Sequence, residues 1–172
     1  MTFEAPIWLG DVQTVGRKFK TVAVGGTFDE FHKGHRVLLL KAFEVSDRIL
    51  IGLSTDELVQ RMGKPHLIST YDFRLEELKG FLRKEGLLGR AEIMPLHDAY
   101  GVTLSKGCVN ALVVSRETEK TAEEINKKRR AKRLEPLNIV VIGMVPAYNS
   151  KPISTTRIRR GEIDKEGQML AK

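Results

Sequence analysis

Two histidines three residues apart, His32 and His35, are the side chains of this sequence best placed to do chemistry. If a helix begins near His32, both imidazoles project from its first turn on the same side. The first turn of a helix has free backbone N–H groups and a partial positive charge, which together favour phosphate. Two imidazoles beside such a turn suit phosphoryl or nucleotidyl transfer, in which preorganised donors stabilise the charge of the transition state.

The residues around the two histidines leave room for a ligand. Gly25 and Gly26 permit a tight turn, and Gly34 lets a flat ligand or a phosphate approach the backbone. Thr27 adds a hydroxyl donor. Two alternatives stay open: a metal site, for which zinc usually needs a third protein ligand that the sequence does not place, and an ordinary pair of helix histidines.

A second segment with phosphate-binding side chains lies near the end of the chain. Ser154, Thr155 and Thr156 are followed by Arg157 and Arg159. Hydroxyls and guanidinium groups at the start of a helix suit a polyphosphate tail. A plain serine N-cap is the alternative, but two such helix starts at opposite ends of one domain favour a nucleotide site.

Buried strands and amphipathic helices alternate along the chain. Strands are predicted at residues 21–24, 48–53, 91–96, 110–114 and 137–145, and helices at 34–45, 57–62, 69–85, 119–133 and 157–161. Such alternation predicts a single α/β domain with a doubly wound, five-stranded parallel sheet covered on both faces. Ligands of such sheets bind outside the carboxyl ends of the strands, where the first histidine segment begins.

Composition narrows the class of protein. A length of 172 residues with 41% hydrophobic and 30% charged residues is typical of one globular domain. No apolar run is long enough to span a bilayer and no secretory pattern opens the chain, so a cytoplasmic protein is expected. The net charge of +7 suits anionic partners. We interpret the basic run 127–133 as a solvated helix face rather than a nucleic-acid patch.

The two candidate segments together resemble the signatures of the HxGH nucleotidyltransferase superfamily, whose members share a Rossmann-like domain. The first matches Gly-Gly-Thr-Phe-Asp followed by His-x-Gly-His, and the second matches Ile-Ser-Ser/Thr-Thr-x-x-Arg. Lys64, residues 68–74, residues 115–118 and residues 124–126 narrow the resemblance to the archaeal and eukaryotic type of phosphopantetheine adenylyltransferase. This resemblance covers about residues 21–165. We therefore divide the chain into an N-terminal extension, 1–20, and a nucleotidyltransferase domain, 21–172.

The resemblance implies adenylyl transfer from ATP to 4′-phosphopantetheine, giving dephospho-CoA and pyrophosphate by direct in-line attack. Magnesium is expected to bridge the phosphates of ATP and to use few protein ligands. Dephospho-CoA or CoA is expected as product or inhibitor. The family resemblance leans toward a monomer, and no membrane partner is expected.

Residue roles follow from the match. His35 should donate to the α-phosphate, His32 should hold the ATP phosphates, and Lys64 should hold the attacking phosphate. The predicted catalytic residues are His35, His32, Lys64 and Arg159. The predicted nucleotide-binding residues are Gly25, Gly26, Thr27, Phe28, His32, Gly34, His35, Ser115, Glu117, Ser154, Thr155, Thr156, Arg157 and Arg159. The predicted acceptor-binding residues are Thr27, Lys64, Arg74, Asp98 and Tyr100.

Other functions stay open at this point. Glycerol-phosphate cytidylyltransferase and FMN adenylyltransferase are the alternatives among enzymes, although residues 149–152 do not match the Arg-Thr-x-Gly run of cytidylyltransferases. A nucleotide sensor or a nucleic-acid-binding module is the alternative outside enzymes. Arg74 could instead pair with Glu77, three residues further along its helix.

Overall fold

A five-stranded, all-parallel sheet forms the centre of the computed structural model, which describes residues 17–64 and 66–171. The strand order is β3-β2-β1-β4-β5, so the first strand is the middle one. The strands are β1 (Phe19–Gly26), β2 (Ser46–Ser54), β3 (Ala91–Leu96), β4 (Ala111–Ser115) and β5 (Asn138–Ile142). The predicted α/β class and parallel sheet are confirmed.

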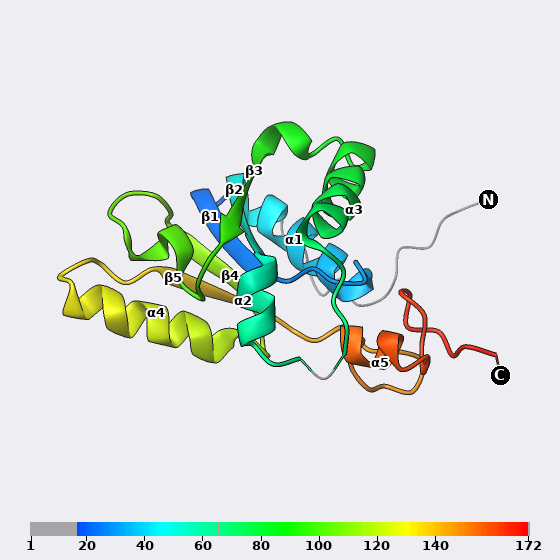
Figure 1. Ribbon diagram of the computed structural model, residues 1–172. Helices are drawn as coiled ribbons and strands as arrows, with labels where there is room; N and C mark the ends of the chain where they lie inside the picture. Colours follow the sequence, from blue (N-terminus) through cyan, green and yellow to red (C-terminus); the bar gives the residue numbers. More distant parts are fainter. Residues whose placement is uncertain (1–16, 65, 172) are drawn as a thin grey trace.

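Helices cover both faces of this sheet (Figure 1). They are α1 (Lys33–Val45), α2 (Asp56–Arg61), α3 (Tyr71–Lys84), α4 (Glu119–Ala131) and α5 (Thr155–Arg159), with short 3-10 helices at Leu88–Arg90 and Gly101–Leu104. α1 and α3 pack on one face, and α4 packs on the other. Among the described residues, no helix is long and apolar enough to cross a membrane.

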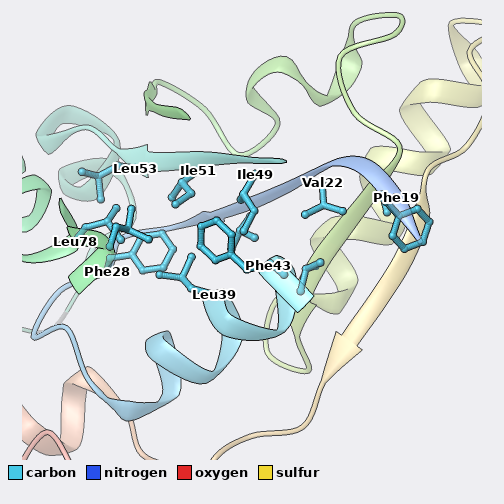
Figure 2. Close-up of a cluster of buried hydrophobic side chains, with 14 of the residues drawn as sticks. Phe19, Val22, Phe28, Leu39, Phe43, Ile49, Ile51, Leu53 and Leu78 are labelled. Carbon is cyan, nitrogen blue, oxygen red and sulfur yellow. The ribbon is translucent and has the colours of Figure 1, made fainter. Parts of the chain in front are cut away.

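The alternation of side chains along the strands separates two cores. Val22 and Val24 point toward α1 and α3, whereas Ala23, between them, points toward α4. Figure 2 shows the larger core, in which aromatic and aliphatic side chains such as Phe43 and Ile49 fill the space between the sheet and α1. These two layers fix the carboxyl ends of the strands, where the functional segments begin.

The strand bounds differ from the prediction by up to three residues. β1 begins at Phe19 rather than Thr21, because the buried Phe19 already pairs with Ser46 of β2. β5 ends at Ile142 rather than Val145, because its partner β4 ends at Ser115, opposite Ile142. Most of the predicted N-terminal extension, residues 1–20, lies outside the described residues.

Candidate active site

One cavity of about 400 Å³ lies at the carboxyl ends of the strands. Most of the predicted site residues line it: Gly25, Gly26, Thr27, Phe28, His32, Gly34, His35, Lys64, Asp98, Tyr100, Ser115, Glu117, Ser154, Thr155 and Thr156. These residues come from five separate segments of the chain. The cavity has the position that parallel sheets give to ligands and a size typical of small-molecule sites.

The two histidines form the start of α1 as a reciprocal cap. His32 is the N-cap residue, and its Nδ1 accepts a hydrogen bond from the backbone N–H of Gly34 at 3.1 Å. The Nδ1 of His35 accepts from the backbone N–H of His32 at 3.3 Å. The two rings stack with their centroids 3.7 Å apart. This arrangement satisfies two helix-terminal donors and fixes both ring orientations.

Both imidazoles are neutral near pH 7, and their hydrogen bonds define the tautomer. Burial and the charge of Arg36 lower the pKa of His32 to about 4. Burial and the neighbouring His32 hold the pKa of His35 well below its usual value. Because each Nδ1 accepts a hydrogen bond, each neutral ring carries its proton on Nε2. The helix start therefore presents two N–H donors that need no prior protonation.

Two phenylalanine rings support His35. The ring of Phe28 is buried and its centroid lies 5.3 Å from that of His35, while Phe31 lies 5.7 Å away. These rings account for much of the burial of the imidazole. Phe28 thus borders the cavity from within the hydrophobic core, and its predicted contact with the nucleotide remains a prediction.

Asp29 connects three segments of the site. Its carboxylate, which is 1% exposed, accepts hydrogen bonds from Arg159 at 2.9 and 3.2 Å and from the backbone N–H of Ser69 at 3.1 Å. Its backbone carbonyl accepts from the Thr155 hydroxyl at 3.0 Å. Burial works to raise the pKa of Asp29, but the hydrogen bonds from Arg159 and Ser69 outweigh burial and lower it. Asp29 thereby ties the first signature to the second.

The turn around Asp29 has an uncommon backbone. Phe28 and Glu30, on either side, have φ angles of 51° and 50°. A residue with a Cβ pays roughly 1–2 kcal/mol for this left-handed conformation. The contacts of Asp29 hold the turn in place, and strained backbone of this kind is concentrated at functional sites.

Arg159 does not line the cavity as predicted. Its guanidinium donates to Asp29 and to the Ser69 hydroxyl, and it lies 3.1 Å from a carboxylate oxygen of Glu30. Arg159 thus holds the second signature against the first. Its predicted contact with the ATP phosphates remains a prediction.

Arg157 and Arg74 also lie outside the cavity lining. Arg157 forms an ion pair with Glu162 at 3.0 Å and donates to the carbonyl of Pro152 at 2.9 Å, which holds the segment before α5. The predicted phosphate contact of Arg157 remains a prediction.

Arg74, which was predicted to bind the acceptor, has a completely buried side chain that does not line the cavity. It donates to the carbonyls of Thr27 and Ser54 at 2.9 and 2.8 Å, and to the Asp56 carboxylate at 2.8 Å. The alternative partner, Glu77, is not used either. Arg74 instead stabilises the loop that contains Thr27 by binding its backbone carbonyl.

The segment between α2 and α3 reaches across to the second signature. Lys64 lines the cavity, as predicted. His66 lines it as well, and its Nε2 lies 3.2 Å from the Thr156 hydroxyl. His66 was not predicted as a site residue, because a lone histidine in a loop carries no signal of its long-range partner.

The loop after β3 is folded around Asp98. The Oδ1 of Asp98 accepts from the backbone N–H groups of Tyr100 and Gly101 at 2.7 and 2.8 Å. These hydrogen bonds, led by that of Gly101, lower the pKa of Asp98. Asp98 thus shapes the loop, and the ring of Tyr100 lies 4.9 Å from the Lys128 ammonium.

An apolar part of the cavity was missed by the sequence analysis. It lies on the α4 side of the sheet, and its lining includes Ala23, Leu50, Met94, Val102, Leu112, Ala122 and Ile125. In sequence these residues cannot be told from ordinary core residues. Gly52 was the available signal, since a Cβ there would lie 2.6–2.7 Å from Leu96. A glycine inside a buried strand marks such a close approach.

Known proteins resemble this chain in both sequence and fold. A model of the cytidylyltransferase-like family matches residues 23–161. The phosphopantetheine adenylyltransferase of Methanothermobacter thermautotrophicus is 45% identical over 156 residues, which cover 91% of this chain and 93% of the relative. The chain belongs to the phosphopantetheine adenylyltransferase family. The phosphopantetheine adenylyltransferase of Methanopyrus kandleri is 44% identical over 86% of this chain and 92% of its own length.

Solved structures share the fold of this chain. A protein of unknown function from Archaeoglobus fulgidus is 32% identical with a TM-score of 0.64, covering 71% of this chain and 88% of the other. A lipopolysaccharide core biosynthesis protein from Thermoplasma volcanium has a TM-score of 0.56 at 19% identity, covering 72% and 96%. The second likeness concerns the fold alone. The predicted superfamily and the predicted archaeal type are confirmed.

Proposed function

We propose that this protein transfers the adenylyl group of ATP to 4′-phosphopantetheine, giving dephospho-CoA and pyrophosphate in coenzyme A biosynthesis. The observation that carries the proposal is one cavity lined by Lys64, the two N–H-donating histidines and the hydroxyls of residues 154–156, in a chain of this family. These groups come from three segments far apart in sequence. Their meeting provides a continuous path of phosphate-binding groups.

The proposed path has two ends with His35 between them. Thr27 and Lys64 border the cavity where we place the phosphate of 4′-phosphopantetheine. Ser154, Thr155 and Thr156 border it where we place the β- and γ-phosphates. The free N–H groups of α1 add to the positive potential between the two ends.

The chemistry proposed is a direct displacement. An oxygen of the acceptor phosphate attacks the α-phosphorus of ATP and forms the new P–O bond, while the bond to the bridging oxygen of pyrophosphate breaks. The Nε2–H of His35 donates to an α-phosphate oxygen as charge develops there. Because His35 is neutral, it donates across the physiological pH range without gaining a proton first.

Magnesium is proposed to enter as part of the substrate, bridging the phosphates of ATP. Among residues 17–64 and 66–171, no group of three or more His, Cys, Asp or Glu side chains could hold a metal ion. The protein's contribution would then be hydroxyl, imidazole and lysine donors to the phosphate oxygens. A requirement for magnesium is tested by adding a chelator to the assay and restoring the metal.

The apolar part of the cavity suits the pantetheine arm of the acceptor. Leu50, Met94 and Val102 offer apolar surface there. The arm carries methyl and methylene groups whose burial contributes roughly 0.8 kcal/mol for each fully buried CH₂. Glu117, which follows the carboxyl end of β4 and lines the same cavity, remains the candidate for contact with the ribose or adenine.

Pyrophosphate release in a matrix of nucleotides and acceptors tests the proposal. ATP and CTP are each incubated with 4′-phosphopantetheine, glycerol 3-phosphate and FMN, and the product is identified by mass spectrometry. We expect release only with ATP and 4′-phosphopantetheine, with dephospho-CoA as the product. Activity with CTP and glycerol phosphate alone, or with FMN alone, would replace the proposal by one of those enzymes. ATP binding without pyrophosphate release from any acceptor would indicate a binding module.

Inhibition by dephospho-CoA or CoA and a monomeric state are further expectations. Adding either thiol to the pyrophosphate assay tests the first. Light scattering across a range of protein concentrations tests the second. Neither outcome changes the proposed reaction.

A further inference from the structure

One residue of the basic run 127–133 differs from its neighbours. Arg129 is only 5% exposed, whereas Lys127, Lys128 and Arg130 are exposed. It stands on the face of α4 that buries Ala122 and Ile125, at the spacing of one helix stripe. A charged side chain thus occupies a position where the helix pattern calls for an apolar one.

The guanidinium of Arg129 donates hydrogen bonds to backbone carbonyls. Its Nη1 donates to the carbonyls of Thr103 and Ser105 at 2.5 and 3.1 Å, and its Nε donates to that of Glu135 at 2.7 Å. Burying a guanidinium is costly unless its donors are satisfied in this way. An apolar residue would pack against the core without that cost, so the polar contacts indicate a requirement other than core packing.

Arg129 holds the loop that covers the apolar part of the cavity. Tyr100, Val102 and Thr103 of this loop line the cavity opposite the sheet. The loop is folded within itself, since the Thr103 hydroxyl and backbone N–H both donate to the Tyr100 carbonyl. Arg129 connects α4 to this loop through the carbonyls of Thr103, which lines the cavity, and of Ser105.

We propose that Arg129 is a positioning residue that sets the width of the acceptor's apolar pocket by holding the loop of residues 97–105 against α4. This inference rests on the proposed function, because the pocket is assigned to the pantetheine arm there. Arg129 does not itself line the cavity. It acts through Thr103 and its neighbours in the loop, and so determines which acceptor arm fits.

Kinetics of R129M and R129K, with R130M as the matched control on the same helix, test the proposal. For R129M we expect the KM for 4′-phosphopantetheine to rise by about tenfold or more, with kcat and the KM for ATP within about twofold, since small misplacements far from the chemistry have such effects. R129K keeps the charge but cannot span three carbonyls, so a smaller rise is expected. R130M should match the wild type.

Acceptor selectivity separates positioning from a general loss of folding. The ratio of kcat/KM for 4′-phosphopantetheine to that for 4′-phosphopantothenate, which has a shorter arm, should fall in R129M. Partial unfolding would lower kcat with both acceptors equally and leave the ratio unchanged. Trypsin cleavage after the exposed Lys106, mapped by mass spectrometry, should become faster in R129M and not in R130M.

Two results would overturn the proposal. A folded R129M with wild-type KM and selectivity shows that the loop does not depend on Arg129. If R129M fails to fold, an unchanged acceptor KM and unchanged Lys106 cleavage in folded R129K have the same meaning. A wild-type protein without activity toward 4′-phosphopantetheine instead contradicts the proposed function, whereas faster cleavage in R129M would still establish that Arg129 holds the loop.

Discussion

His35 illustrates how much a single residue depends on its surroundings. A free imidazole titrates near pH 6.5, but burial beside His32 and the rings of Phe28 and Phe31 keeps this one neutral. Its Nδ1 is occupied by the His32 backbone N–H. The ring is therefore left with one donor, Nε2–H, held in a fixed direction at the start of α1.

Replacing His35 should impair turnover rather than ATP binding. We expect H35A to lower kcat by roughly 10²–10³, the usual effect of removing one transition-state donor, with the KM for ATP nearly unchanged. H35Q, whose amide can place a donor near the position of Nε2, should retain more activity than H35N. Steady-state kinetics of the three variants measure this.

His97 provides the control for this prediction. It is exposed and does not line the cavity, so H97Q should behave as the wild type. Equal loss of activity in H35Q and H35N would show that the position of the donor does not matter. An unchanged kcat in H35A would refute the role of His35.

At the scale of elements, buried or partly buried arginines join strands, helices and loops by binding backbone carbonyls. Arg90, which is partly buried, donates to the carbonyls of Phe43 and Ser46 at 2.8 and 2.6 Å, in the last turn and at the C-cap of α1. Arg74 donates to the carbonyl of Thr27, and Arg129 connects α4 to the loop of residues 97–105 by donating to the carbonyl of Thr103. The planar, five-donor guanidinium suits this use, since one side chain can satisfy several carbonyls.

Asp29 joins the two signatures by accepting hydrogen bonds from Arg159 and Thr155, and the variant D29N tests this role. We expect D29N to lower the free energy of unfolding by about 1–3 kcal/mol, because charge-assisted hydrogen bonds in a buried site are lost. The KM for ATP should rise as the segment containing Thr155 loosens. Urea unfolding and steady-state kinetics measure the two effects.

E30Q is the matched control for D29N. Glu30 also contacts Arg159, at 3.1 Å, but its side chain is 22% exposed compared with 1% for Asp29. A partly exposed ion pair is worth less than about 1 kcal/mol. Equal effects of D29N and E30Q would mean that burial of Asp29 has no special importance.

Gly52 and Gly80 test the packing, because Gly52 is closely packed and Gly80 has open space around it. An alanine Cβ at Gly52 would lie 2.6–2.7 Å from three atoms of Leu96, so G52A should lower stability by about 1–3 kcal/mol and weaken acceptor binding. At Gly80, inside α3, nothing lies within 4 Å, so G80A should raise stability by roughly 1 kcal/mol. Urea unfolding of both variants checks the opposite signs, and stabilisation by G52A would contradict the close packing.

At the scale of the whole molecule, the buried histidines make stability depend on pH. Folded His32 has a pKa of about 4, whereas the unfolded imidazole titrates near 6.5. Between these values only the unfolded chain takes up the proton, so the free energy of unfolding falls as the pH drops through this window. For His32 alone the loss is about 3 kcal/mol at pH 4, and His35 adds to it in the same direction.

Urea unfolding between pH 7 and 4.5 measures this dependence. H32N removes the titrating group while keeping a side chain that can cap α1. We expect the stability of H32N to fall less steeply than that of the wild type as the pH is lowered. Identical slopes for the two proteins would show that His32 is not the source.

The order of strands and helices and the two signatures could be predicted from the residues alone. The run of residues 21–24, the helix start at His32 and the N-cap at Ser154 were all predicted, because hydrophobic periodicity, turns and caps are local properties. The parallel sheet followed from their alternation. The sheet in turn placed both signatures at the same edge, and so most of the predicted site residues line the cavity.

The partners of the arginines and the apolar part of the cavity became visible only in the folded chain. Arg159 meets Asp29 across 130 positions of the chain, and Arg129 meets Thr103 across 26. Arg74, Arg157 and Arg159 were predicted to bind phosphate. The sequence alone does not distinguish an arginine that binds carbonyls or carboxylates of its own chain from one that binds a ligand. The difference lies in which oxygens the folded chain brings within about 3 Å, and the packing of distant segments sets those distances.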